Sequence, residues 1–195
     1  MTARGLLLAD ACALVVVDMQ ERLAPAIADI ADITEGARAL LEAAAALGVP
    51  AAFTEQYPRG LGPTLPALRA LAPGAAVFEK TRFDAAAQPG ENLGLWARSS
   101  GRRTVLLCGT EAHVCVLQTA FGLAAQGQDV AVVADATGAR RPQDRALALE
   151  RLARAGIGIL STEMVLFEWL GEAGTPEFEA LRGTIKALGA RKGPN

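Results

Sequence analysis

The chain has 195 residues, of which 51% are hydrophobic and 21% charged, and its formal net charge is −2. This composition is typical of a globular protein with a sizeable core, and it excludes a disordered or fibrous chain. Arginines occur singly or in pairs rather than as a basic patch, so we expect no nucleic-acid partner. No apolar run reaches about 18 residues, so we also expect no membrane span.

The first segment, residues 1–18, resembles a secretory signal because a positive charge precedes an apolar stretch. Asp10 interrupts that stretch, however, and residues 13–18 (ALVVVD) have the β-branched composition of a buried strand. The chain has three cysteines, which cannot all pair with one another, and a cytosolic compartment would keep them reduced. We therefore expect a cytoplasmic protein.

Short apolar runs alternate with longer Ala- and Leu-rich segments along the rest of the chain. The predicted strands are residues 13–18, 50–55, 75–80, 104–109, 129–135 and 156–161. The predicted helices lie near 25–47, 91–100, 113–126 and 142–155, and a tail adds a short helix at 163–170 and a last one that ends at Lys186. Apolar strands separated by helices indicate a parallel sheet covered on both faces. We predict one three-layer α/β domain over residues 1–195, with no linker or internal repeat.

Polar residues gather at the carboxyl ends of the predicted strands, which is where open α/β sheets bind their ligands. They are Asp18, Glu55, Lys80, Thr110, Glu111, Cys115, Asp135, Ser161 and Thr162. No nucleotide motif accompanies them, because "GIGILS" lies inside a predicted strand and no P-loop string is present. A chemistry other than nucleotide binding is therefore expected at this edge.

The segment "CGTEAHVCV", residues 108–116, holds the only histidine, His113, two positions before Cys115. Zinc sites of hydrolases need several His or Cys ligands at defined spacing, and neither H-E-x-x-H nor paired C-x-x-C occurs, so we expect no metal. A direct His113–Cys115 dyad is awkward, since residues i and i+2 of such a turn point to different sides. His113 instead borders a pocket or caps the turn.

Cys115 follows a strand and lies in the first turn of the next predicted helix. Free N–H groups and a partial positive charge at a helix start stabilise a thiolate, lower its pKa and receive an oxyanion. The alternative is a buried structural cysteine. Cys108 lies inside a strand, and Cys12 lies about 20 Å from the strand ends at ~3.3 Å per residue.

Asp18 and Lys80 each have an ordinary interpretation as well as a functional one. Asp18 suits the cap of a turn. Lys80, one of three lysines, suits an exposed loop. Asp135 competes with Asp18 as a base, although "ADATGARR" is more typical of a turn and of an oligomer contact.

Taken together and in order, five segments resemble the isochorismatase-like cysteine hydrolase superfamily, and within it the isochorismatase-domain-containing branch. They are "ALVVVDMQERL", "VFEKTRFD", "CGTEAHVCVLQTA", "VAVVADATGAR" and "STEMVLFEWL". The resemblance implies a six-stranded parallel sheet of order 3-2-1-4-5-6 and a catalytic triad of Asp18, Lys80 and Cys115. It also implies a cis peptide between Thr110 and Glu111, with the backbone N–H groups of Glu111 and Cys115 as the oxyanion hole.

The family's nicotinamidases bind a metal near the second strand through an aspartate and histidines. The corresponding segment here, "FTEQYPRGLG", has no histidine, so we expect neither a metal nor another cofactor. The residues expected to contact a small-molecule substrate are Glu55, Tyr57, Phe83, Glu111 and His113. The apolar "MVLFEWL" favours a homo-oligomer, unless it packs under the last helix.

The function that this apparatus favours is hydrolysis of a small amide or carbamoyl C–N bond through a Cys115 thioester. One alternative is isochorismatase-type cleavage of a vinyl ether, in which acid catalysis by Asp18 matters most. Another is a thiol redox protein, although no second cysteine is placed to resolve a sulfenic acid. The last is a non-catalytic binding protein on the same fold.

Overall fold

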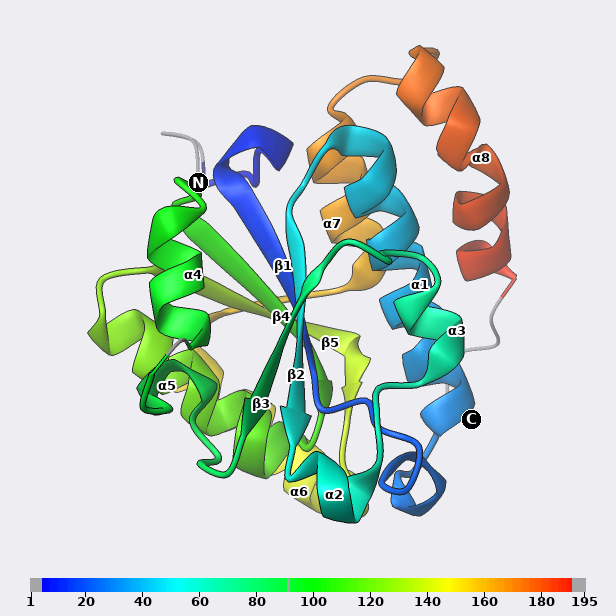
Figure 1. Ribbon diagram of the computed structural model, residues 1–195. Helices are drawn as coiled ribbons and strands as arrows, with labels where there is room; N and C mark the ends of the chain where they lie inside the picture. The colour runs from blue at the N-terminus through cyan, green and yellow to red at the C-terminus, as the bar shows by residue number, and fades with distance from the viewer. Residues whose placement is uncertain (1–4, 91, 191–195) are drawn as a thin grey trace.

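The computed structural model describes residues 5–90 and 92–190, and a six-stranded parallel sheet of order β3-β2-β1-β4-β5-β6 lies at its centre (Figure 1). The strands are β1 Cys12–Val17, β2 Ala51–Gln56, β3 Ala76–Lys80, β4 Thr104–Thr110, β5 Asp129–Gly138 and β6 Gly158–Leu160. The strand order and the α/β class are those expected from the sequence. The carboxyl ends of β1, β2 and β3 meet at one edge, the lower one in Figure 1.

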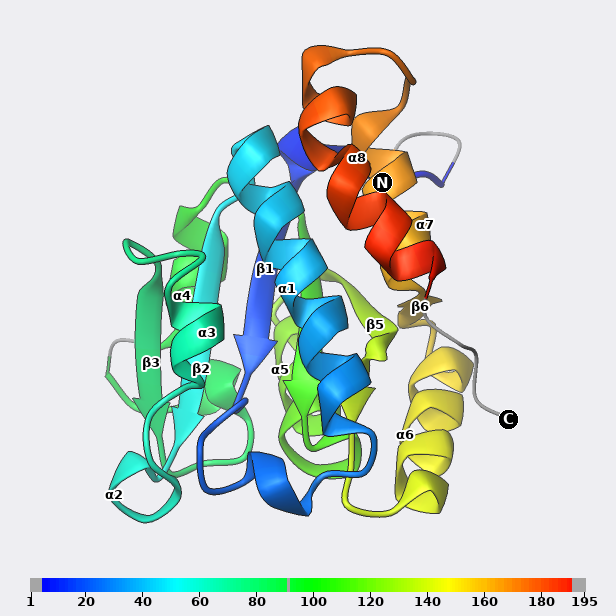
Figure 2. The same ribbon diagram turned by 90° about the vertical axis from the view of Figure 1, so that its right-hand side faces the viewer.

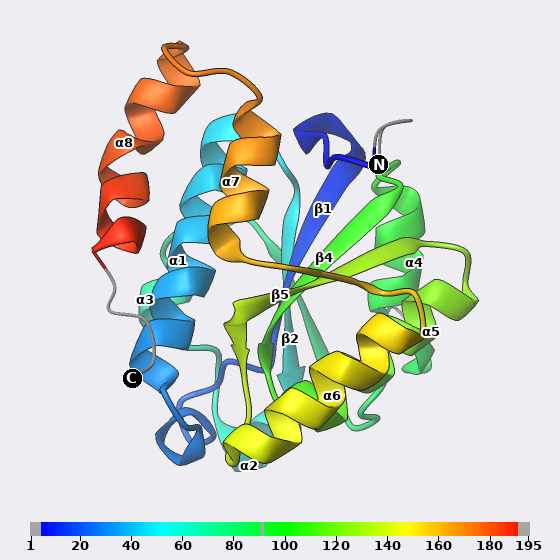
Figure 3. The same cartoon turned by 180° about the vertical axis from the view of Figure 1, so that it is seen from behind.

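Helices cover both faces of the sheet (Figures 2 and 3). The helices are α1 Ile30–Leu47, α2 Pro58–Leu61, α3 Pro66–Arg69, α4 Leu93–Ser99, α5 Leu117–Ala125, α6 Pro142–Arg154, α7 Thr162–Leu170 and α8 Pro176–Gly189. On one face α7 lies beside α1, and α8 packs outside them; α4, α5 and α6 lie on the other face. None of the helices in the described ranges is long and apolar enough to cross a membrane.

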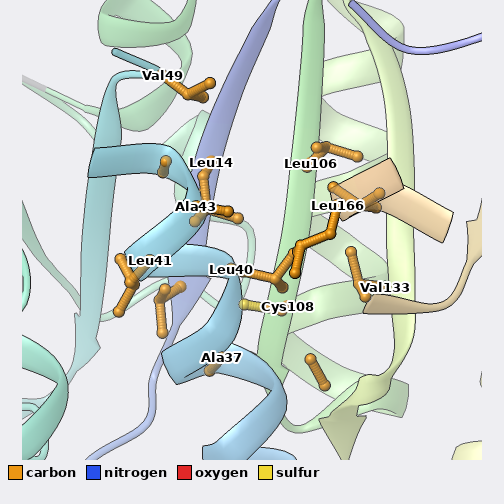
Figure 4. Close-up of a cluster of buried hydrophobic side chains, with 14 of the residues drawn as sticks. Leu14, Ala37, Leu40, Leu41, Ala43, Val49, Leu106, Cys108, Val133 and Leu166 are labelled. Carbon is orange, nitrogen blue, oxygen red and sulfur yellow. The ribbon is translucent and has the colours of Figure 1, made fainter. Parts of the chain in front are cut away.

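The core divides into two clusters because successive strand residues point to opposite faces of the sheet. Leu14 and Leu106 pack with Leu40 of α1 and Leu166 of α7 on one face (Figure 4). Val15, Val17 and Leu107 point to the other face, where they pack with residues of α5 and α6. The strands are therefore apolar on both sides, as the sequence indicates.

Several predicted elements have different bounds in the structure. The helix expected near 25–47 begins only at Ile30, after a short 3-10 turn at Ala24–Ala26. The fifth strand continues to Gly138 through an irregularity, because Leu107 pairs with Val132 whereas Gly109 pairs with Thr137. Residues 133–136 of β5 therefore stand opposite a single residue of β4, which is a β-bulge.

Candidate active site

Asp18, Lys80 and Cys115 come from three separate parts of the chain to the carboxyl edge of the sheet. Asp18 directly follows β1, Lys80 is the last residue of β3, and Cys115 lies in the turn that follows β4. Their exposed fractions are 0%, 2% and 6%, so all three belong to the interior of the protein. Lys80 is therefore not an exposed loop residue, which was the ordinary interpretation of this lysine.

Asp18 and Lys80 form a fully buried ion pair. Lys80 Nζ lies 2.7 Å from Asp18 Oδ2, and both side chains are 0% exposed. The other carboxylate oxygen, Oδ1, accepts a hydrogen bond of 2.6 Å from the hydroxyl of Thr54. Taking two charges out of water is costly, so each of them depends on the other for its stability in this position.

The backbone of Asp18 is held in an uncommon conformation. Its φ is +47°, in the left-handed region that non-glycine residues seldom adopt. Its N–H donates to the carbonyl of Thr54 at 3.1 Å, and its carbonyl accepts from the hydroxyl of Thr110 at 2.8 Å. The neighbouring strands β2 and β4 thus fix the direction in which the carboxylate points.

Gln56, which the sequence analysis did not single out, is a further member of the site. Its Oε1 accepts a hydrogen bond of 2.7 Å from Lys80 Nζ and lies 4.0 Å from Cys115 Sγ. Gln56 and Thr54 are two residues apart on β2, so both side chains face Asp18 and Lys80. The alternation of side chains in "FTEQ" could have indicated this, because it places Thr54 and Gln56 on the same face of the strand.

Glu55, expected to contact the substrate, points away from Gln56 and Thr54 because it lies between them on the strand. Its Oε1 accepts hydrogen bonds of 2.7 Å from both the N–H and the hydroxyl of Thr64. The structure therefore gives Glu55 a different role from the expected one, which is to anchor the loop that follows α2.

Cys115 lies in a five-residue π-helical turn, Ala112–Val116, from which α5 continues. Burial raises the pKa of its thiol to about 12, the Asp18 carboxylate acts in the same direction, and Lys80 opposes them. This is the reverse of the low pKa expected from a helix start, because loss of solvation outweighs the partial charge of the turn. A thiol with this pKa is protonated at neutral pH.

Just before this turn, the paired strands β4 and β1 approach each other closely at Gly109. Gly109 has φ +115°, and a Cβ at this position would lie 2.1 Å from the carbonyl oxygen of Val17. Only glycine therefore permits β4 to pass this close to β1, directly before Asp18. The peptide bond between Thr110 and Glu111, which follow this glycine, is cis.

The remaining predicted site residues lie around this edge. Tyr57 follows β2 and is 56% exposed, and Phe83 follows β3 and is 50% exposed. Glu111 is 8% exposed, and its Oε1 accepts from Arg140 Nε at 2.8 Å. His113 faces Asp144, with 3.9 Å between Nε2 and Oδ2.

Asp135, the competing base, does not join the site. Its Oδ1 accepts hydrogen bonds from the N–H and the hydroxyl of Thr162, at 2.7 and 2.9 Å, at the start of α7.

Cys12 and Cys108 are both 0% exposed. Within residues 5–90 and 92–190 we find no cluster of three or more His, Cys, Asp or Glu side chains arranged to hold a metal ion.

Comparisons with known proteins show which family this fold belongs to. A family profile described as "Isochorismatase domain" matches residues 12–164. Isochorismatase domain-containing protein 1 of Danio rerio is 42% identical over 176 residues, which are 90% of this chain but only 61% of the relative. Isochorismatase domain-containing protein 2 of the same fish is 38% identical and covers 87% of this chain and 84% of its own.

A solved structure, that of the MAR1 ribonuclease from Caenorhabditis elegans, superposes with a TM-score of 0.86. It is 34% identical in sequence, and the match covers 93% of both chains. The chain thus spans about three fifths of the first of these relatives but nearly the whole of the solved structure.

Proposed function

The chain belongs to the isochorismatase family, and we propose that it is a hydrolase that cleaves the C–N bond of a small amide or carbamoyl compound through a thioester on Cys115. The observation that carries the proposal is the burial of an Asp18–Lys80 ion pair beside a thiol that is also buried. The ion pair is costly to maintain, and it is adjacent to the one described cysteine that is not fully covered.

In the first half of the reaction Asp18 takes the proton of the Cys115 thiol, and Lys80 stabilises the resulting thiolate. The sulfur then forms a bond to the carbonyl carbon of the substrate. The backbone N–H groups of Glu111 and Cys115 donate to the oxyanion, a contribution that is typically worth 10²–10³ in rate for each donor. Asp18 returns its proton to the nitrogen, and the C–N bond breaks to release the amine.

In the second half Asp18 accepts a proton from water as the water oxygen attacks the thioester carbon. The C–S bond breaks, the acid or carbamate leaves, and the proton on Asp18 returns to sulfur. The raised pKa of Cys115 suits this cycle, because the thiol is neutral at the start and at the end.

The neighbourhood of the site supports a small substrate. Tyr57 and Phe83 are exposed at the ends of adjacent strands, where aromatic side chains suit contact with a small organic molecule. Glu111 and His113 complete the expected contacts, whereas Glu55 is engaged with Thr64. We propose no cofactor.

RNA cleavage is a second candidate, favoured by the name of the solved structure that is 34% identical. The formal net charge of −2 weighs against it, because binding of RNA phosphates calls for a cationic surface. Vinyl ether cleavage is the third, and it would depend chiefly on proton donation by Asp18.

One set of assays separates these reactions. Small amides, carbamoyl compounds, vinyl ethers and RNA are given to the wild type, Cys115→Ala, Asp18→Asn and the control Cys12→Ala. An amidase loses nearly all turnover in the first two variants, and mass spectrometry finds an acyl group on Cys115 that hydroxylamine removes. A vinyl ether hydrolase suffers most from Asp18→Asn and forms no acyl-enzyme. Near-normal turnover of Cys115→Ala on the best substrate overturns the thioester proposal.

We also propose that the protein is a cytoplasmic homo-oligomer. All three cysteines are free, which agrees with a reducing compartment.

On α7, Met164 and Phe167 are each 47% exposed, whereas Val165 and Leu166 of the same helix are buried in the core. One apolar face of α7 therefore packs in the core, and the other is exposed to solvent. Light scattering of the purified protein tests whether a second copy of the chain covers the exposed face.

A further inference from the structure

The side-chain amide of Gln56 lies between the Lys80 ammonium and the Cys115 thiol. Its Oε1 is 2.7 Å from Lys80 Nζ and 4.0 Å from Cys115 Sγ, the latter at the outer limit of a hydrogen bond to sulfur. We propose that Gln56 is a positioning residue that holds the ammonium of Lys80 between Asp18 and Cys115 and accepts the S–H of the resting thiol. This role rests on the proposed function of Cys115 as the nucleophile.

The orientation of the amide follows from its partners. Nε2 donates a hydrogen bond of 2.9 Å to the carbonyl of Thr81. If the amide were reversed, its NH2 group would face the ammonium and its oxygen would face that carbonyl, and both contacts would be repulsive. The oxygen therefore has to point at Lys80 and Cys115.

The backbone of Gln56 is fixed by a second glutamine. Gln20, which is 0% exposed, accepts from the N–H of Gln56 at 2.8 Å and donates to its carbonyl at 3.1 Å. Gln20 Nε2 also donates to the carbonyl of Gly62 at 2.6 Å. The end of β2 is thus tied to the segment after β1, and the Gln56 side chain starts from a defined point.

An ammonium has three protons, and the described side chains around Lys80 provide acceptors for two of them. One contacts Asp18 Oδ2 and one contacts Gln56 Oε1. The positive charge of Lys80 also acts to lower the pKa of Cys115, so the position of the ammonium matters to the thiol. Without Gln56, Nζ keeps only its contact with Asp18 Oδ2, so the lysine side chain is held less firmly beside the sulfur.

A neutral acceptor is the suitable group at this position. A carboxylate here would be the second negative charge beside Cys115, after Asp18, and it would compete with Asp18 for Lys80. An apolar side chain of equal length would leave the ammonium with one acceptor fewer and would remove an acceptor that stabilises the protonated thiol. The two replacements therefore act on the thiol in opposite directions.

The test is the rate at which iodoacetamide alkylates Cys115, measured from pH 6 to pH 10 by mass spectrometry of intact protein and peptides. The variants are Gln56→Glu and Gln56→Met, and Gln143→Met is the matched control, since Gln143 is exposed at the start of α6. Cys12 and Cys108 in the same samples report the integrity of the core, because both are fully buried.

In Gln56→Glu the added charge raises the pKa of Cys115, so alkylation at a given pH becomes about tenfold slower, as for a shift of one pKa unit. In Gln56→Met the neutral thiol loses its acceptor, the pKa falls, and alkylation becomes several-fold faster. On the best substrate, kcat nonetheless falls about tenfold or more in Gln56→Met, because Lys80 no longer holds the thiolate in place. Gln143→Met matches the wild type in both measurements.

Gln56→Met should therefore combine faster alkylation of Cys115 with slower turnover. General loosening of the fold would also expose Cys12 and Cys108, so the combination points to Gln56 itself when those two cysteines stay unreactive. Alkylation profiles of both Gln56 variants within twofold of the wild type overturn the positioning role. So does full kcat in Gln56→Met. Alkylation needs no substrate, so these failures leave the hydrolase proposal intact. Near-normal turnover by Cys115→Ala, by contrast, overturns the thioester proposal and, with it, the catalytic part of the role of Gln56.

Discussion

Two buried cysteines, Cys108 and Cys115, lie on opposite faces of the sheet, and the difference between their surroundings is instructive. Burial raises the pKa of each thiol to about 12, and each has an aspartate nearby, Asp135 for Cys108 and Asp18 for Cys115. Only Cys115 also has a cation, Lys80, and only Cys115 has any exposed surface. A buried thiol with a carboxylate is therefore an ordinary core residue until a cation and a path to solvent are added.

The largest expected effect separates the two cysteines by function. Cys115→Ala should reduce kcat/KM by at least about a thousandfold, because the nucleophile is lost, whereas Cys108→Ala should retain turnover within a few-fold. Steady-state kinetics on the best substrate checks this. Equal losses in the two variants would mean that the fold, and not the nucleophile, had been damaged.

The next largest effect concerns the buried ion pair. Lys80→Met leaves the Asp18 carboxylate without its partner and should lower the free energy of unfolding by about 3–5 kcal/mol. Adding Asp18→Asn should restore part of this loss, since the uncompensated charge is then gone. Urea denaturation of both single variants and of the double variant measures the coupling. If the two losses simply add, the pair is not an interacting unit.

The third prediction concerns pH. Because burial holds the pKa of Cys115 at about 12, the thiolate fraction should rise with pH throughout the accessible range. Alkylation of native protein should accelerate about tenfold per pH unit between pH 7 and pH 9, with Cys115 modified before Cys12 and Cys108. A rate that is already constant at pH 7 would indicate a thiolate stabilised by its turn.

The smallest effect distinguishes the two aspartates. Asp135→Ala removes the acceptor for two groups of Thr162 at the start of α7, and it should lower the free energy of unfolding by about 1–2 kcal/mol. Turnover should stay close to that of the wild type, in contrast to Asp18→Asn. Thermal unfolding and kinetics on the same samples measure both, and a strong loss of turnover would return Asp135 to the site.

The fold and three residues of the candidate site were accessible from the sequence, for identifiable reasons. Asp18 and Lys80 stand out because each ends an apolar strand, and parallel strands bring their carboxyl ends to one edge. The order of the strands came from the resemblance to a family and not from their composition. Gln56 was missed because the second strand was expected to end at residue 55, so Glu55 stood for its carboxyl end, whereas β2 continues to Gln56.

The direction of the Cys115 pKa was also inaccessible, again for a physical reason. A sequence shows that a cysteine begins a helix, which lowers the pKa, but not how much protein covers it, which raises the pKa. The role of Asp135 was hidden by the bulge in β5, since it depends on where a strand of irregular register meets α7.

The close passage at Gly109 has a consequence for redesign of this scaffold. A side chain there would collide with Val17, so any substitution would separate β4 from β1 and move Cys115 relative to Asp18. Phe83, by contrast, is half exposed and can be exchanged with little effect on folding, whereas Tyr57 has φ +39° and tolerates fewer replacements. A combinatorial library for new substrates should therefore randomise Phe83 first and keep the glycine constant.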